Sequence, residues 1–138
     1  MKIAIINGPN LNLLGKREVD IYGNESFDTY MLVLKEKYPM VQFSYFQSNI
    51  EGDIITEIQR AGFDFNGIVI NPAGYSHTSV SIGDAIAAVP VKTVEVHISN
   101  IFNREEFRKL SYVSASAVGV ISGLGLKGYD LAIEYLLG

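Results

Sequence analysis

Five short runs of apolar and β-branched residues alternate with longer segments of helical spacing, and this alternation strongly constrains the fold. We predict a strand at each run, namely Ile3–Asn7, Val41–Gln47, Gly67–Asn71, Thr93–His97 and Ala117–Ser122. Three of the runs show little polar alternation, which is typical of strands buried on both faces. Regular alternation of strand and helix therefore predicts an α/β fold, with a parallel sheet covered by helices on both faces.

The segments between these runs place apolar residues three and four positions apart, which is typical of helices. We predict helices at roughly Ser26–Lys37, Glu51–Ala61, Ser79–Ala88 and Tyr129–Leu137, and a short turn near Arg104–Lys109. The residue types at the helix ends predict N-caps at Ser26 and Asn49 and helix stops at Pro39 and Gly62.

The composition favours one compact domain over residues 1–138. At 138 residues and 48% hydrophobic residues, the chain can bury a sizeable core without a metal or a disulfide. Cysteine is absent, which excludes a thiolate nucleophile and a Cys-based metal site and suits a reducing cytoplasm. Two histidines without cysteine make a poor zinc set, so we expect no metal.

Charge and hydropathy exclude several classes of partner. The net charge of −4, with mixed signs throughout, predicts no nucleic-acid binding. No apolar stretch is long enough to span a membrane, and the N-terminal run is too short for a signal peptide. We therefore expect a cytoplasmic protein that binds any anionic ligand through a local site.

Polar residues gather where the predicted strands end. Asn7, Asn71 and His97 each close a strand, and His77 lies in the segment that follows Asn71. Ligands of open α/β sheets bind beyond the carboxyl ends of the strands, so both histidines should meet at one edge. Taken singly, the two asparagines could simply occupy turns.

The segment 95–108 combines a carboxylate, an imidazole, a hydroxyl, an amide and two guanidiniums directly after an apolar run. Glu95 lies two residues before His97, on the same strand face, and could orient its ring. Alternatively, His97 is a structural histidine, and Ser99 caps the short helix that follows. This density of polar groups favours a catalytic pocket.

The charged segment 13–23 is bounded by Gly15 and Gly23 and could move as a lid over the strand ends. A solvated connection is the alternative. As a lid it would carry Arg17 and Tyr22. A tyrosine hydroxyl has a pKa of about 10 and becomes a useful base only beside a cation, for which Arg17 and Arg108 are the obvious candidates.

Several longer motifs together resemble type II 3-dehydroquinate dehydratase. They occur in order over essentially the whole chain, at residues 7–15, 17–18, 22–23, 48–52, 77–80, 95–100 and 104–108. The resemblance implies a flavodoxin-like fold with strand order 2-1-3-4-5 and a dodecamer built from trimers. It also implies a cofactor-free anti elimination, through an enolate, of water from 3-dehydroquinate in the shikimate or quinate pathway, the shikimate route leading to chorismate and aromatic amino acids.

The resemblance also implies catalytic roles at matching positions. Tyr22 would remove the proton beside the ketone, and Arg17 would stabilise its phenolate. Asn10 would hold a water that stabilises the enolate. His97 would protonate the departing hydroxyl, with Glu95 fixing its orientation. Such an elimination needs a positioned base, a stabilised enolate and an acid for the leaving hydroxide.

By the same resemblance, the substrate carboxylate would bind Asn71 and the backbone amides of Ile98 and Ser99. His77 and Arg108 would bind the substrate hydroxyls. No lysine lies inside an apolar strand, which argues against an imine-forming route to the same product.

Two positions depart from the family pattern. Gly83 precedes Asp84 where many members carry a basic residue, so the contact of Asp84 with a neighbouring subunit's site could differ. Val19 stands where proline is common, which would make the lid less stiff. The alternatives to a dehydratase are a flavodoxin-like module that binds a small anion without chemistry, and a different lyase or isomerase acting on a polyhydroxylated acid.

Overall fold

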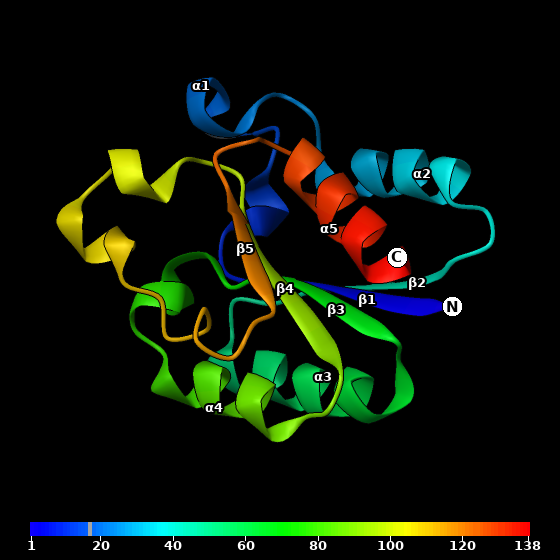
Figure 1. Cartoon of the computed structure of the whole chain (residues 1–138). Helices are drawn as coiled ribbons and strands as arrows, with labels where there is room; N and C mark the ends of the chain where they lie inside the picture. The colour runs from blue at the N-terminus through cyan, green and yellow to red at the C-terminus, as the bar shows by residue number, and fades with distance from the viewer. Residues whose placement is uncertain (17) are drawn as a thin grey trace.

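The computed structural model describes residues 1–16 and 18–138 and is built around a parallel sheet of five strands in the order β2-β1-β3-β4-β5 (Figure 1). The strands are β1 Lys2–Asn7, β2 Gln42–Gln47, β3 Gly67–Asn71, β4 Lys92–His97 and β5 Gly119–Ser122. The predicted α/β class and the strand order 2-1-3-4-5 are therefore confirmed. Asn7 is aligned with Asn71 across the β1–β3 pair, so the two strands end at the same level.

Helices α2 and α5 cover one face of the sheet, and α3 and α4 cover the other (Figure 1). The helices are α1 Val19–Tyr22, α2 Phe27–Lys37, α3 Glu51–Asp64, α4 Val80–Ala88 and α5 Lys127–Leu137. Short 3₁₀ turns follow three of the strands, at η1 Leu11–Leu13, η2 Ala73–His77, η3 Ile101–Asn103 and η4 Glu106–Lys109. Within the described ranges, no helix combines the length and the apolar character that crossing a bilayer requires.

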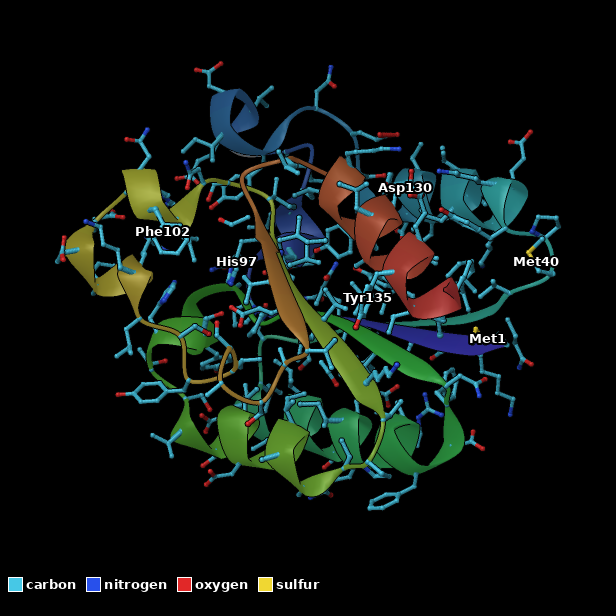
Figure 2. The ribbon with its side chains drawn as sticks, in the orientation of Figure 1. Met1, Met40, His97, Phe102, Asp130 and Tyr135 are labelled. Atoms are coloured by element: carbon cyan, nitrogen blue, oxygen red, sulfur yellow. The ribbon has the colours of Figure 1, made fainter. Side chains whose placement is uncertain are left out.

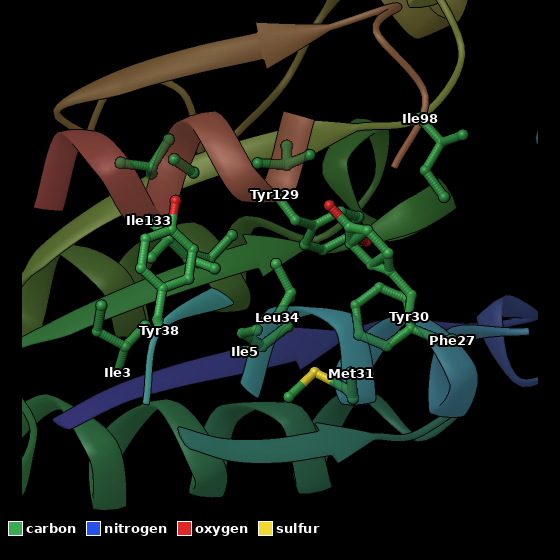
Figure 3. Packing of buried hydrophobic residues seen from close by; sticks show 14 of the residues in the cluster. Ile3, Ile5, Phe27, Tyr30, Met31, Leu34, Tyr38, Ile98, Tyr129 and Ile133 are labelled. Carbon is green, nitrogen blue, oxygen red and sulfur yellow. The ribbon is translucent and has the colours of Figure 1, made fainter. Parts of the chain in front are cut away.

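Alternation along the central strands creates two apolar clusters. Ile3 and Ile5 of β1 pack with residues of α2 and α5 (Figure 3). Ala4 and Ile6, which point to the opposite face, pack with residues of α3 and α4. All four side chains are fully buried. The sheet is thereby held between two helical layers, with its carboxyl ends at one rim.

The two edge strands are less buried than the sequence predicted. β2 is only partly covered along its length, and Gly119 and Val120 of β5 are exposed. Their residue types resemble those of the central strands because each edge strand still packs against helices on part of its surface. Their lower burial follows from their position at the edges of the sheet, and the pattern of residue types does not show which strands are edge strands.

The sequence predicted that α3 stops at Gly62, but the helix continues to Asp64. A Cβ atom at Gly62 would lie 2.4 Å from the Cβ of Val89, at the end of α4. The glycine therefore allows the two helices to approach closely. Because Gly is enriched both at helix ends and at close contacts, the sequence alone did not separate the two uses.

Two predicted helix starts also need correction. Ile50, not Asn49, is the N-cap of α3, because the Asn49 side-chain oxygen accepts the backbone N–H of Asn10 instead. The last helix begins at Lys127, two residues before the predicted Tyr129. The prediction for Ser26 is confirmed, since its hydroxyl accepts the N–H of Thr29 at the start of α2.

A buried carboxylate joins α5 to the end of α2. Asp130 accepts hydrogen bonds from the ammonium groups of Lys37, at 2.7 Å, and Lys127, at 2.5 Å, and from the Tyr38 hydroxyl, at 2.5 Å. Burial alone would raise the pKa of this carboxyl, but the three donors outweigh burial and lower the pKa to about 2. The ionised carboxylate therefore stabilises the folded state.

We expect Asp130→Asn to lower the free energy of unfolding by about 2 kcal/mol at pH 7, measured by urea denaturation. Since the folded-state pKa is lowered, this contribution is present above about pH 4, the range of an unfolded aspartate, and is lost as the pH falls towards 2. Glu134→Gln, which removes an exposed partner of Lys37, is the control and should cost under about 0.5 kcal/mol. An equal loss in both variants would contradict this account.

Candidate active site

A cavity of about 290 Å³ lies beyond the carboxyl ends of β1, β3 and β4, which is the size of a small-molecule site. His97, at the end of β4, lines this cavity; Figure 2 labels it, together with Phe102 in the segment that follows β4. Eight of the residues singled out in the sequence line this cavity: Asn10, Tyr22, Asn71, His77, His97, Ile98, Ser99 and Arg108.

The ring of His97 is hydrogen-bonded to the buried carboxylate of Glu95. The Nε2 atom of His97 lies 2.5 Å from Oε2 of Glu95, and both side chains are buried. Because an ionised carboxylate can only accept, Nε2 carries the hydrogen, and Nδ1 is the ring nitrogen left for the cavity. The spacing of two residues along β4 therefore brings Glu95 and His97 into contact, as the sequence predicted.

Glu95 is ionised although it is fully buried. Burial raises the pKa of its carboxyl, but hydrogen bonds from His97 and from the hydroxyls of Ser114 and Ser111 more than offset this, so its pKa lies below the usual range. The ionised carboxylate accepts the Nε2 hydrogen of His97 and so fixes the orientation of the ring. The pair has the arrangement of a general acid with its orienting carboxylate.

His77 is held through the other ring nitrogen, Nδ1. Its Nδ1 atom lies 2.6 Å from the backbone carbonyl oxygen of Leu110, so Nδ1 carries the hydrogen. Burial lowers the pKa of His77, and the nearby His97 and Arg108 lower it further. The neutral ring therefore offers the lone pair of Nε2 to a ligand hydroxyl. The His77 and His97 rings stack with their centroids 6.1 Å apart, which confirms that the two histidines meet.

Asn71 is oriented by a tyrosine that the sequence analysis did not include among the site residues. The Tyr129 hydroxyl, on the buried side of the site, accepts from Nδ2 of Asn71 at 3.0 Å and donates to Oδ1 of Asn7 at 2.8 Å. Burial raises the pKa of Tyr129 well above its usual range, so the hydroxyl keeps its proton. Oδ1 of Asn71 accepts the N–H of Ala73, which leaves the second Nδ2 hydrogen for an anion in the cavity.

The segment that the sequence offered as a lid contains a helical turn, α1, which the sequence did not predict. Gly15 and Gly23 have φ angles of +86° and +81°, a conformation that glycine adopts readily. Arg17 lies outside the described residues. From the other side of the cavity, the Arg104 guanidinium donates to the hydroxyls of Tyr22 and Ser99, each at 3.1 Å.

Arg104 is therefore a site residue that sequence reasoning missed. It forms part of the motif at residues 104–108, but nothing in the residue types distinguishes it from Arg108. Nε of Arg108 instead donates to Glu105 at 2.6 Å, and this guanidinium lowers the pKa of the Glu105 carboxyl. Both guanidiniums line the cavity, which makes its outer wall a place for oxygen-rich ligands.

Asp84 does not line this cavity; it is exposed on α4. The neighbouring Gly83 packs directly on the segment after η4, because a Cβ atom there would lie 2.3 Å from the carbonyl oxygen of Tyr112. A basic side chain at this position would require the segment to shift. Across residues 1–16 and 18–138, no three His, Asp or Glu side chains gather closely enough to hold a metal ion.

Comparison with known proteins shows the family of this chain. A profile of the dehydroquinase class II family matches residues 1–137. The 3-dehydroquinate dehydratase of Fusobacterium nucleatum is 51% identical and covers 99% of this chain and 97% of its own length. That of Clostridium botulinum, strain Hall, is 50% identical, over 98% of this chain and 93% of its own.

A solved structure shows the same similarity. The type II dehydroquinase of Butyrivibrio crossotus superposes with a TM-score of 0.96 and 48% identity, over all of this chain and 98% of its own. Its fold is the flavodoxin-like fold that the sequence predicted, and the similarity extends over the full length of the chain. The chain belongs to the dehydroquinase class II family.

Proposed function

We propose that this chain dehydrates 3-dehydroquinate to 3-dehydroshikimate, without a cofactor, through an enolate. The observation that carries the proposal is the pairing of Glu95 with His97 in a cavity that also holds the Tyr22 hydroxyl against a guanidinium. A base, an acid and anion-binding groups thus surround a space suited to a small carboxylic acid. Relatives at about 50% identity carry the name of this dehydratase.

Tyr22 would act as the base. As a phenolate it takes the proton from the carbon beside the ketone, and the electron pair moves to the ketone oxygen to give the enolate. Arg104, 3.1 Å from the hydroxyl, stabilises the phenolate, together with Arg17. Asn10, on the cavity wall, would hold the water that donates to the enolate oxygen.

His97 would act as the acid. When the enolate returns to the ketone, its electron pair expels the hydroxyl from the β-carbon, and Nδ1 of His97 supplies the proton, so the leaving group is water. The product is a conjugated enone. Tyr22 then gives up its proton and His97 regains one from solvent. Glu95 stays ionised throughout and holds the ring.

The remaining groups would bind the substrate. The second Nδ2 hydrogen of Asn71 and the backbone amides of Ile98 and Ser99 face the carboxylate. The Nε2 lone pair of His77 accepts from a substrate hydroxyl, and Arg108 donates to another. This division separates binding groups from the reacting pair, which makes distinct kinetic effects possible.

Arg108→Ala should raise KM about tenfold or more and lower kcat much less, because Arg108 contacts the hydroxyls in both the ground state and the transition state. Steady-state kinetics with 3-dehydroquinate measure both constants. Arg60→Ala, on the exposed surface of α3, is the matched control and should leave both unchanged. An unchanged KM in Arg108→Ala would remove this residue from the binding site.

We also propose that the chain assembles into a dodecamer of trimers in which Asp84 approaches a neighbouring subunit's site. Exposed apolar side chains on α4 and on β5 and the residue before it, namely Val80, Val120 and Val118, support an interface there. Analytical ultracentrifugation tests the assembly, and a monomer at micromolar concentration would contradict it. We further propose that the enzyme acts in the cytoplasm, in the shikimate pathway.

The substrate assignment is tested by incubating the purified protein separately with 3-dehydroquinate, quinate and shikimate and recording near-ultraviolet absorbance. We expect the enone absorbance to appear only with 3-dehydroquinate. Turnover of another acid instead would indicate a different lyase. Binding of all three acids without any reaction would favour a module that holds a small anion.

A further inference from the structure

The segment 110–114, which follows η4, contacts the supports of both histidines. The Leu110 carbonyl oxygen accepts from Nδ1 of His77, and the hydroxyls of Ser111 and Ser114 lie against the carboxylate of Glu95. The segment is itself anchored, because the N–H of Tyr112 donates to the carbonyl of Ser76 at 2.8 Å. A single stretch of backbone thus sets the surroundings of both rings.

The hydrogen bonds of Ser111 have only one consistent direction. Its Oγ accepts the backbone N–H groups of Val113, at 3.2 Å, and Ser114, at 3.3 Å. The hydroxyl hydrogen must therefore point to Glu95, whose Oε1 and Oε2 lie 3.0 and 2.9 Å away. Ser114 adds a second donor, with its Oγ 2.7 Å from Oε1. With His97, Glu95 has three donors and can accept all three only as a carboxylate.

We propose that Ser111 and Ser114 are positioning residues for the acid. They hold Glu95 in one orientation, so that Oε2 receives the hydrogen of His97 and Nδ1 of His97 is directed into the cavity. The proposal deepens the dehydratase function proposed above and rests on it. It adds two residues outside the cavity wall to those that determine the rate.

The charges around the pair explain why this support is needed. A buried carboxylate loses most of its hydration and is stable only when its oxygens receive hydrogen bonds. The groups that face His97 across the cavity have mixed charge, namely His77, Arg104, Arg108, Tyr22, Glu18 and Glu105. Glu95 accepts from His97 at Oε2, and the hydroxyls of Ser111 and Ser114 are the donors that stabilise its other oxygen, Oε1.

Ser114→Ala is the sharpest test, because the Ser114 side chain bonds only Glu95 within the described part of the chain. We expect kcat to fall about tenfold with KM within about twofold, as for residues that orient a reacting group. Ser114→Thr, which keeps the hydroxyl, should restore most of kcat. Ser116→Ala, on the same loop, is the matched control and should behave like the unsubstituted chain.

A second measurement does not depend on turnover. The Nε2 hydrogen of His97, bound to a carboxylate, should give a proton resonance far downfield of the amides in the ligand-free protein. In Ser114→Ala we expect this resonance to shift clearly or to be lost by exchange with water, and to stay in place in Ser116→Ala.

An unchanged resonance together with an unchanged kcat would overturn the proposal. So would a lower kcat accompanied by a lower melting temperature and an unchanged resonance, because the role would then be merely structural. If the unsubstituted chain does not convert 3-dehydroquinate, the proposed function fails, whereas the resonance still decides whether the serines position His97.

Discussion

Tyr22→Phe is expected to lower kcat by about 10³ to 10⁴, while the protein stays folded and still binds a non-reacting analogue such as quinate. The substitution removes only the oxygen that we propose as the acceptor of the proton from the carbon beside the ketone. The aromatic ring remains to fill its place at the end of α1. Stopped-flow and steady-state absorbance measure the rate, and calorimetric titration measures the Kd of the analogue.

The chain offers a matched control for this variant. Tyr135→Phe removes a hydroxyl from an exposed position on α5 (labelled in Figure 2), and Tyr135 does not line the cavity. It should leave kcat and KM unchanged. Near-normal turnover by Tyr22→Phe would show that another group removes the proton, and the mechanism would have to be rebuilt around it.

His97→Ala is expected to lower kcat by about 10² to 10⁴, since hydroxide would then have to leave without an acid. The change also leaves Glu95 as a buried carboxylate without its main partner. Imidazole added to the assay should recover part of the rate, because the truncated side chain leaves space next to Glu95. Steady-state kinetics with and without imidazole measure both effects.

The other histidine provides the comparison. His77→Ala removes a ring that stacks on His97 but whose Nδ1 is used by the Leu110 carbonyl. We expect it to raise KM more than it lowers kcat. A loss of less than about tenfold in His97→Ala, or equal kinetic losses in the two variants, would argue against the acid role of His97.

The sequence predicted the parts of this site that depend on strand periodicity. The runs of apolar and β-branched residues placed β1, β3 and β4 correctly, and the polar residue at the end of each strand then had to lie at the same rim. Glu95 and His97 share a strand face because side chains alternate along a strand. These inferences need only local rules and the geometry of a parallel sheet.

The contacts made by irregular segments were not predictable in the same way. Arg104 and Arg108 are chemically identical, and only the path of the chain through η3 and η4 sends the first to Tyr22 and the second to Glu105. Tyr129 is one of the apolar residues of α5 by pattern, yet its hydroxyl reaches two strand ends. Such pairings join residues far apart in the sequence, and no periodicity reports them.

We propose that the chain dehydrates 3-dehydroquinate through an enolate without forming an imine. The most direct test is to mix the purified protein with 3-dehydroquinate, add no cofactor or metal, and follow the enone absorbance, alongside a sample first treated with borohydride in the presence of substrate. The cavity lining in the described part of the chain includes no lysine, so we expect both samples to react at the same rate. Loss of activity after borohydride, or no turnover by the folded protein, would contradict the account.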